Sequence, residues 1–390
     1  MKTYRVAILG CRGRGTAAAR AYHAHPRTEI VALCDLVQDL LDTLGDELGV
    51  AARYTDLDAM IGQHQPDIVA IPTGTEFHHS LALRVLEYGA HIDIEKPLCV
   101  DCQQADEVLA KAREKNARIA VHHQGRVGVY MKAVAKALVE GRIGQLRHIH
   151  GHGKTYYGGY NLMNIGTHMI NNMLKVAGPC HSVVATATTD GHPITPTDVV
   201  PSPQGMGTIA GEHITATLGF ADGVTATLLQ HRFPTPVNPV IEFCGSEGRL
   251  VLSQLVWKRD LGAFLLPQPH YALNDQREPY EVLSPIYCES YDPQSSAHPD
   301  DYAYVEEYVA ALDEGREHEC SGQAGHHIVE IMMGIFESAA YGKRVDLPQQ
   351  DRAHPLLRWR RENGLAPPDP MPRPYAEWLA AEDVRLGRSE

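Results

Sequence analysis

The fold of this chain is decided by residues 4–15, YRVAILGCRGRG. The stretch begins as a short apolar run and continues into three glycines, Gly10, Gly13 and Gly15, ahead of a helical pattern. A strand that enters a glycine-rich turn and then a helix brings backbone N–H groups and the positive end of a helix dipole together. That arrangement binds pyrophosphate, so we expect this turn to bind a dinucleotide.

The residues around the turn bear on which dinucleotide binds. The glycines follow G-x-x-G-x-G, with Arg12 in place of the second glycine of the common G-x-G-x-x-G form. Asp35 ends the next apolar run, where an acid binds the ribose diol and repels a 2′-phosphate. Arg12 and Arg14 favour NADP instead, because an arginine near the ribose binds the 2′-phosphate. We predict NAD, with NADP and a flavodoxin-like fold without nucleotide as the alternatives.

The first third of the chain alternates short apolar runs with helical patterns, which is typical of a parallel α/β sheet. The expected strands are 6–10, 28–35, 67–71, 91–95 and 118–122, and the expected helices are 15–25, 37–48, 77–88 and 102–115. The strands are continuously apolar, as in a sheet covered on both faces. We therefore predict a Rossmann domain over residues 1–125.

A different pattern begins near Arg126 and predicts a second domain, α+β in class, over residues 126–348. The expected strands are 144–153, 181–187, 208–220, 224–232, 240–244 and 249–255, and the expected helices are 130–140, 163–176, 302–312 and 324–341. Turn sequences separate successive strands, which predicts an open antiparallel sheet. Residues 349–390 are rich in proline and charge and are expected to form a C-terminal arm on the surface or on a neighbouring subunit.

Composition limits the classes of partner. The 390 residues favour two domains, and the net charge of −13 argues against nucleic acid or an anionic membrane as partner. No apolar run approaches the roughly 18 residues of a membrane span, and the N-terminus enters a strand without room for a signal peptide. The eight cysteines show no disulfide framework, although Cys99 and Cys102 form a single CxxC. We expect a cytoplasmic protein with reduced thiols.

A second motif, Glu95-Lys96-Pro97, follows the strand over 91–95. The carboxyl ends of parallel strands are where doubly wound folds bind their ligands. Lys96 is therefore expected to place a cation beside the nicotinamide, which suggests hydride chemistry.

With this motif the chain resembles the glucose–fructose oxidoreductase/inositol dehydrogenase/MocA family over roughly residues 3–348. Further matching positions are Pro72 and His78, the turn 141–144, Gly158-Gly159 leading to Gly166 and His168, Ser321-Gly322, and Glu330. The resemblance implies a cofactor site made of Gly10, Arg12, Gly13, Arg14, Gly15, Asp35, Pro72, Thr73, His78, Glu95 and Lys96. These motifs are specific for the family and not for its substrate.

The resemblance also implies a mechanism in which NAD takes hydride from a carbinol carbon. His168 would remove the hydroxyl proton, Lys96 would stabilise the oxygen, and Asn164 would position the imidazole. The family usually carries aspartate where Asn164 stands, and often where Asn171 stands. An amide orients a histidine by hydrogen bonding but does not stabilise an imidazolium by charge. Proton transfer through His168 should therefore be less favourable than in relatives that carry the acid.

Hydroxyl, amide and imidazole groups near this helix suit a polyol, so a sugar or cyclitol is the expected substrate. The predicted substrate residues are Lys96, His123, Arg126, Lys154, Tyr156, Tyr157, Tyr160, Asn164 and His168. His148, His150 and His152 alternate along one expected strand, but collinear side chains converge poorly on one ion, so no metal is predicted.

Three functions remain open at this point. The first is an NAD-dependent sugar or cyclitol oxidoreductase. The second is a redox-neutral glycosidase or lyase, in which bound NAD transiently oxidises the sugar, allows elimination, and returns the hydride. The third is a nucleotide- or sugar-sensing protein without catalysis. An open sheet with one bare face predicts a homodimer or homotetramer.

Overall fold

The computed structural model describes residues 2–232, 240–253, 262–266 and 280–388. Contacts divide the chain into two compact units. The first unit comprises Met1–Cys99, Gln104–Val129 and Tyr287–His326. The second comprises Val100–Gln103, Tyr130–Ile286 and His327–Glu390.

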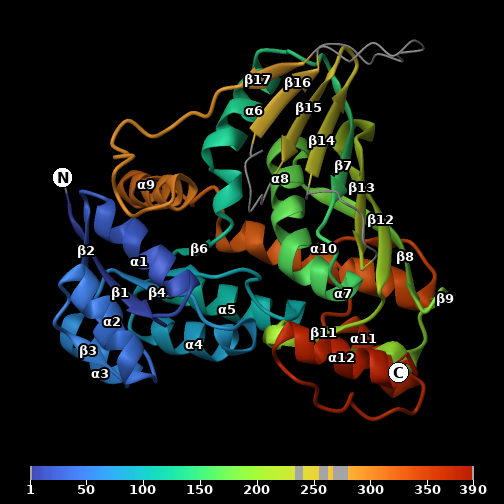
Figure 1. Cartoon of the computed structure of the whole chain (residues 1–390), viewed down its shortest axis with the longest axis horizontal. Coiled ribbons are helices and arrows are strands. Elements are labelled where there is room, and N and C mark those ends of the chain that lie inside the picture. Colours follow the sequence, from blue (N-terminus) through green and yellow to red (C-terminus); the bar gives the residue numbers. More distant parts are fainter. Residues whose placement is uncertain (1, 233–239, 254–261, 267–279, 389–390) are drawn as a thin grey trace. The chain divides into compact units, whose positions relative to one another are not determined.

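The first unit contains a six-stranded parallel sheet in the order β3-β2-β1-β4-β5-β6 (Figure 1). Its strands are β1 Tyr4–Leu9, β2 Thr28–Cys34, β3 Arg53–Tyr54, β4 Ile68–Ile71, β5 His91–Ile94 and β6 Ile119–Val121. Its helices are α1 Arg14–Ala24, α2 Gln38–Leu48, α3 Leu57–His64, α4 Thr75–Glu87, α5 Cys102–Glu114 and α9 Pro299–Glu314. The predicted Rossmann fold is confirmed, with β3 and α3 as additions that were not predicted.

Helix α9 returns to the first unit from late in the sequence. Its Tyr302, Tyr304 and Tyr308 are buried in the same core cluster as residues of β1 and α1, and the Tyr302 ring lies 5.4 Å from that of His25. Residues 302–312 were expected in the second domain, and they pack with the first unit instead. The predicted boundary between residues 125 and 126 stays a prediction.

The second unit contains a ten-stranded sheet with the order β17-β16-β15-β14-β7-β13-β12-β8-β18, and β9 pairs with β8. Its strands are β7 Leu146–His152, β8 Cys180–Thr189, β9 His192–Pro193, β12 His213–Phe220, β13 Thr225–His231, β14 Val240–Gly245, β15 Arg249–Ser253, β16 Gly262–Leu266, β17 Glu281–Leu283 and β18 Val345–Asp346. All pairs are antiparallel except β7 and β13, which run parallel, so the sheet is mixed rather than wholly antiparallel as predicted. The end of the expected strand 249–255 lies outside the described residues.

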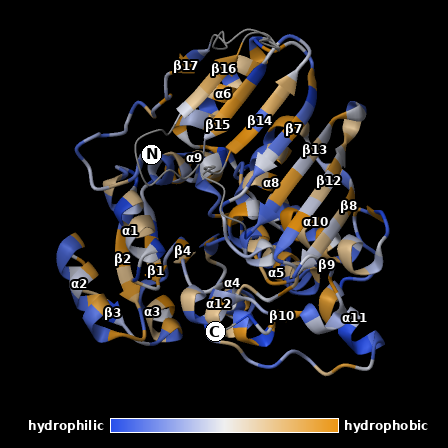
Figure 2. Cartoon of the chain, turned by 45° about the vertical axis from the view of Figure 1, so that its right-hand side comes forward, coloured by the Kyte–Doolittle hydropathy of each residue, from blue (hydrophilic) through white to orange (hydrophobic). Residues whose placement is uncertain are grey.

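The strands of this sheet bury one face. Figure 2 shows hydrophobic and hydrophilic residues alternating along β12, β13 and β14, and burial alternates with the same period. Helices α6 Val129–Val139 and α8 Thr167–Ala177 lie along the buried face (Figure 1). A β-carbon built on Gly151 of β7 would meet Met173 of α8 at 2.5 Å, so glycine allows this close approach.

The remaining elements of the second unit are short, apart from one long helix. They are α7 Gly158–Asn161, a π-helix over Leu162–Gly166, β10 Val200–Pro201, β11 Thr208–Ile209, and α10 Gly322–Tyr341, whose first residues belong to the first unit. Among the described residues, no helix is long and apolar enough to span a membrane.

The C-terminal arm contains two helices that were not predicted from the sequence. It forms α11 Pro355–Glu362 and α12 Tyr375–Arg385, and both belong to the second unit. Trp378 of α12 is fully buried, and its indole Nε1 donates to the carbonyl of Pro201 at 2.7 Å. The proline-rich stretch that suggested an arm joins these two helices rather than replacing them.

Replacing Trp378 with alanine should destabilise the second unit, because it leaves a large cavity and an unpaired carbonyl. We expect a loss of about 3–5 kcal/mol in the free energy of unfolding, measured by urea denaturation. Val384 lies on the same helix with 61% of its surface exposed, so Val384→Ala is the matched control and should change stability by less than about 0.5 kcal/mol. Equal midpoints for the two variants would contradict a folded, anchored arm.

Candidate active site

The predicted cofactor residues of the first unit follow the carboxyl ends of four neighbouring strands. The glycine turn follows β1, Asp35 follows β2, Pro72 and Thr73 follow β4, and Lys96 lies just beyond β5. Because the sheet is parallel, all these ends meet at one edge. The order changes direction between β1 and β4, which is the point where such sheets bind nucleotides.

The glycine turn presents backbone donors at this edge. Gly10 adopts a φ of 112°, which favours glycine, and a β-carbon on Gly15 would lie 1.9 Å from the Gly10 carbonyl oxygen. The amides of Gly10 and Gly15 are bonded to the carbonyls of Cys34 and Arg12. The amides of Arg12, Gly13 and Arg14 have no acceptor within the described part of the chain. They remain available for a pyrophosphate at the start of α1.

Asp35 is tied to the glycine turn. Its carboxylate accepts from the amide of Cys11 at 2.7 Å and from that of Val37 at 2.9 Å. The side chain stays partly exposed, and each carboxylate oxygen has capacity for a further donor. The carboxylate thus fixes the turn, and it fits the predicted contact with a ribose diol.

Two predicted cofactor residues after β4, Thr73 and His78, differ in whether their polar atoms already have hydrogen-bond partners. The buried hydroxyl of Thr73 has no hydrogen-bond partner among the described residues, as expected for a group that meets a ligand. His78 is fully buried, and its ring nitrogens lie 2.9 Å from the Pro97 carbonyl and 3.1 Å from the Thr73 carbonyl. His78 thus holds together the segments that follow β4 and β5, and its contact with the cofactor stays a prediction.

A largely buried cluster of charges adjoins the backbone of Lys96. Arg14 donates from Nε to Glu95 at 2.7 Å and from Nη2 to Asp301 of α9 at 2.9 Å. Glu95 in turn accepts from the backbone amide of Lys96 at 3.0 Å. Burial alone would raise the pKa of Glu95, but the charges of Arg14 and Lys96 lower it. Because two donors of Arg14 are already directed at carboxylates, its side chain gives little support for binding a 2′-phosphate.

His122 extends this cluster. Its Nε2 lies 3.1 Å from Asp301 and its Nδ1 lies 3.1 Å from Asp93 of β5, which also accepts from Tyr22 and Tyr304. Burial alone would lower the pKa of His122, yet the two carboxylates outweigh it and raise the pKa to about 10. An imidazole with a carboxylate at each nitrogen is protonated and donates to both. We name the five residues Arg14, Asp93, Glu95, His122 and Asp301 the charge cluster.

The other predicted substrate residues of the first unit lie beyond β6. His123 is buried, and burial together with the charge of Lys96 lowers its pKa to about 3, so it is neutral. Arg126 ends a short 3-10 helix, Gln124–Arg126, and is half-buried, as is Lys96. A neutral imidazole beside a half-buried lysine fits a polar, uncharged substrate group.

In the second unit, Asn164 and His168 lie on one continuous helical stretch. Asn164 is in the π-helix and His168 is in the first turn of α8. Both side chains are half-buried, whereas Asn171, expected on the same face, is fully buried. The Asn164 amide donates from Nδ2 to the Tyr160 hydroxyl at 3.0 Å. A π-helix within an α-helix is common at functional sites, and residue spacing does not reveal it.

The predicted substrate residues before this helix fall into two groups. Lys154 and Tyr156 are partly exposed, with the Lys154 Nζ 5.8 Å from the centre of the Tyr156 ring. Tyr160 is buried, and it contacts Asn164. Tyr157 is fully buried and donates its hydroxyl to Glu382 of α12 at 3.1 Å. Tyr157 thus contacts the C-terminal arm, and its contact with substrate stays a prediction.

The histidines of β7 pair with neighbouring strands. His148 lies 2.9 Å from the Thr225 hydroxyl, and the Nε2 atoms of His152 and His231 are 2.9 Å apart. Within the described ranges, no three histidine, cysteine or acidic side chains are grouped so as to hold a metal ion.

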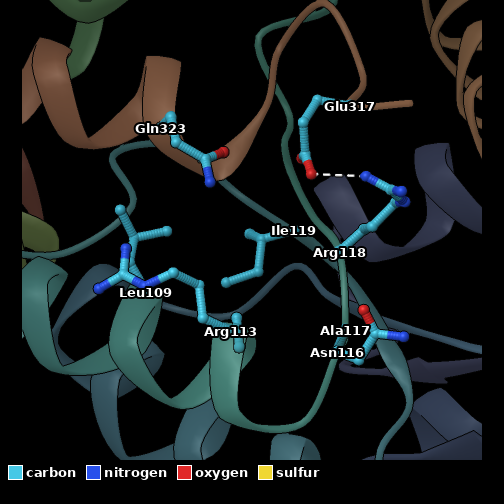
Figure 3. A pocket seen from close by; sticks show the side chains of 9 residues that line it. Leu109, Arg113, Asn116, Ala117, Arg118, Ile119, Glu317 and Gln323 are labelled. Atoms are coloured by element: carbon cyan, nitrogen blue, oxygen red, sulfur yellow. Dashed lines mark hydrogen bonds and ion pairs between the residues drawn. The ribbon is translucent and has the colours of Figure 1, made fainter. Parts of the chain in front are cut away.

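A separate hollow of the first unit is shown in Figure 3. It is lined by Leu109, Ala112, Arg113, Asn116, Ala117, Arg118, Ile119, Glu317 and Gln323. Arg118 and Glu317 form an ion pair of 2.6 Å across it. The hollow lies at the amino end of β6, whereas the glycine turn lies at the carboxyl edge of the sheet. It is therefore distinct from the predicted cofactor site.

Sequence reasoning missed Asp93, Asp301 and Tyr375, a residue of α12 that contacts the tyrosines before the π-helix. Asp93 interrupts an otherwise apolar strand, and that unusual acid was a usable signal. Asp301 and Tyr375 reach their partners only through long-range folding, and no local pattern marks them.

The protonation of His122 gives a testable pH dependence. Because its pKa is raised above the ordinary value near 6.5, its contribution to stability is complete below about pH 6.5 and is lost as pH rises toward 10. His122→Gln should cost about 3–5 kcal/mol at pH 6.5 and less at pH 10, measured by denaturant unfolding. The exposed His23 supplies the control His23→Gln, which should leave both values unchanged. A ¹⁵N NMR titration of His122 with a midpoint near 6.5 would contradict the charged assignment.

Comparison with known proteins agrees with this geometry. A family model described as "Oxidoreductase family, NAD-binding Rossmann fold" matches residues 4–123. A second model, described as "Oxidoreductase family, C-terminal alpha/beta domain", matches residues 136–347. Together they cover most of the chain and leave the C-terminal arm unmatched.

Individual relatives are more distant. A D-glucoside 3-dehydrogenase of Escherichia coli is 29% identical over 192 residues, which is 45% of this chain and 54% of the relative. A glycosyl hydrolase family 109 protein of Streptomyces coelicolor is 26% identical over 161 residues, 38% of this chain and 34% of the relative. The chain thus spans about half or less of the length of these curated relatives.

Among solved structures, a levoglucosan dehydrogenase in complex with NADH and levoglucosan superposes with a TM-score of 0.73 at 19% identity, covering 89% of this chain and all of that one. This likeness shows a shared fold. With both family models matched in order and the Rossmann sheet observed, the chain belongs to the Gfo/Idh/MocA family of NAD-binding oxidoreductases.

Proposed function

We propose that this chain is an NAD-dependent oxidoreductase that transfers hydride between nicotinamide and a secondary hydroxyl of a sugar, cyclitol or sugar derivative. The observation that carries the proposal is the conjunction, at one edge of the first unit, of three unpaired amides in the glycine turn, the Asp35 carboxylate and Lys96. Relatives named as dehydrogenases of a glucoside and of an inositol support the substrate class.

The residues of the edge fit the cofactor. The amides of Arg12, Gly13 and Arg14 would hold the pyrophosphate, Asp35 would accept from the ribose diol, and the buried Thr73 hydroxyl would contact the bound molecule. Pro72, Gly10 and Gly15 shape the surface against which the cofactor lies. NAD, when bound, would supply the hydride acceptor.

The proposed proton chemistry uses Lys96, His168 and Asn164. His168 would take the hydroxyl proton as general base, and the Lys96 ammonium would stabilise the oxygen as its charge develops. Asn164 would orient the site by hydrogen bonding without adding a negative charge. His123, Arg126, Lys154, Tyr156 and Tyr160 would contact the remaining hydroxyls of the substrate.

The redox-neutral reaction is the second candidate, and Asn164 favours it. With asparagine at position 164, where the family usually carries aspartate, the usual role of His168 in alcohol oxidation is less favourable, and a relative is named as a glycosyl hydrolase. The two candidate reactions differ in whether NAD stays bound to the protein during dialysis. After exhaustive dialysis and denaturation, mass spectrometry should find little nucleotide if NAD exchanges as in a dehydrogenase. About one NAD per chain would favour the glycosidase or lyase instead.

The exposed face of the large sheet suggests how the protein assembles. One face of the large sheet carries partly exposed apolar residues, among them Val184 at 50% and Val282 at 60% exposure. A homodimer or homotetramer through this face would cover them. We propose a cytoplasmic protein that acts on a small carbohydrate and has no nucleic-acid partner.

Lys96→Met should abolish turnover and should affect cofactor affinity much less. Removing the cation that stabilises the substrate oxygen should lower kcat by about 10²–10⁴-fold. NADH formation on a panel of sugars and cyclitols measures turnover, and NADH fluorescence measures binding. The control is Lys136→Met, since the Lys136 side chain is 66% exposed. Turnover retained in Lys96→Met would reject the assignment of Lys96.

Asp35→Asn should weaken the preference for NAD over NADP. The amide keeps one acceptor for the glycine turn but removes the charge that repels a 2′-phosphate, so the ratio of the two dissociation constants should shift at least tenfold toward NADP. Titration with each reduced cofactor measures the ratio. Asp39→Asn, at an exposed position of α2, is the control. An unchanged ratio would show that Asp35 only holds the turn.

A further inference from the structure

The C-terminal arm brings Tyr375 against residues proposed to bind substrate. The Tyr375 ring stacks on Tyr160 with centroids 5.0 Å apart and an interplanar angle of 23°, and it meets Tyr156 edge-on at 5.0 Å. Its hydroxyl accepts from the backbone amide of Tyr157 at 2.9 Å. Trp378, one turn further along α12, lies parallel to it at 6.3 Å. The first residue of α12 is therefore part of the tyrosine cluster that precedes the π-helix.

We propose that Tyr375 is a substrate-contacting residue, and that its ring forms with Tyr156 an aromatic surface for the apolar face of a sugar ring. The inference rests on the proposed function and deepens it by naming a cyclic sugar rather than an open-chain polyol as substrate. The Tyr375 ring is held by Tyr160 and Trp378, which are both buried. Tyr156 and Tyr375 remain partly exposed and so present ring surface to a ligand.

Polar groups of the same unit border the aromatic surface on the side of Asn164. Tyr160 connects it to Asn164 through the 3.0 Å hydrogen bond, and the Lys154 ammonium lies 5.8 Å from the centre of the Tyr156 ring. Small-molecule sites combine aromatic walls with a few placed polar groups. The ring C–H groups of a pyranoside or cyclitol would pack on the tyrosines, and its hydroxyls would reach the amide and the ammonium.

The arm is anchored to its own chain, so Tyr375 is held in place. Glu382 is fully buried and accepts from the Tyr157 hydroxyl and from both Nε and Nη2 of Arg385. Near the end of the arm, Arg388 donates to Glu212 from Nη1 at 2.5 Å and from Nη2 at 2.7 Å. Although burial alone would raise the pKa of Glu212, its hydrogen bonds lower the pKa to about 2, so this anchor is charged at neutral pH.

Tyr375 lies outside the region shared by the family. The second family model ends at residue 347, and the arm follows it. A substrate contact supplied from this segment makes the choice of sugar a property of this chain, not of the family pattern. It also assigns a function to the arm beyond stability.

The test compares three variants, Tyr375→Ala, Tyr375→Phe and the control Glu377→Ala, which changes an exposed residue of the same helix. Saturation-transfer NMR with NADH present measures binding of methyl β-D-glucopyranoside and myo-inositol, and NADH fluorescence measures cofactor affinity. Tyr375→Ala should weaken binding of the better probe at least tenfold with unchanged NADH affinity. Tyr375→Phe, which keeps the ring, and Glu377→Ala should stay within threefold of the wild type.

Four results would overturn the inference: probe binding within twofold in Tyr375→Ala, an equal loss in Tyr375→Phe, an equal loss of NADH affinity, or a wild-type protein that binds neither probe. Turnover assays distinguish failure of this inference from failure of the proposed function. If Tyr375 controls probe binding but no sugar or cyclitol in the panel is oxidised or reduced, the proposed oxidoreductase function fails and the binding surface stands. If turnover occurs and Tyr375→Ala leaves KM unchanged, the proposed oxidoreductase function stands and the inference about Tyr375 fails.

Discussion

The Asp301 carboxylate, shared between the guanidinium of Arg14 and the imidazolium of His122, is the interaction on which the first unit depends. Burying charges is costly unless each is paired and hydrogen-bonded, and here every member of the charge cluster has an opposite partner within 3.1 Å. The cluster joins the start of α1, the carboxyl ends of β5 and β6, and α9. Through Glu95 it also holds the backbone of Lys96, so the placement of the proposed catalytic lysine follows from this internal pairing.

Most of the first unit could be predicted because its signals are local. The glycine turn, Asp35 and Lys96 each follow a short apolar run, and the parallel order of such runs gathers their ends at one edge. The charge cluster could not be predicted in the same way. Arg14 and Asp301 are 287 residues apart, and neither lies in a pattern that indicates its partner. The position of His78 was identified from the sequence, but the contacts of its ring with the carbonyls of Pro97 and Thr73 were not predicted.

In the second unit the alternation of strands predicted the sheet, but local spacing failed at two places. The single parallel pair, β7 with β13, depends on a crossover that alternation cannot reveal. The π-helix over Leu162–Gly166 changes how Asn164 and His168 project, and no residue type marks it. The helices of the C-terminal arm were also not predicted, because its proline and charge content indicated only an arm, and the proline-rich stretch in fact joins α11 and α12. The contact of Tyr157 with Tyr375 spans 218 residues and only appears once both helices have docked.

The return of Tyr287–His326 to the first unit has a consequence for how the protein is made. Synthesis runs from the N-terminus, and the sheet strands of the nucleotide-binding unit leave the ribosome first. Asp301 and the tyrosines of α9 are added only after most of the second unit has been translated. Until then Arg14 and His122 lack their shared anion, and the core cluster is short of three aromatic side chains. The nascent Rossmann unit therefore completes its fold late, and a fragment ending at residue 125 lacks its last segment, Tyr287–His326.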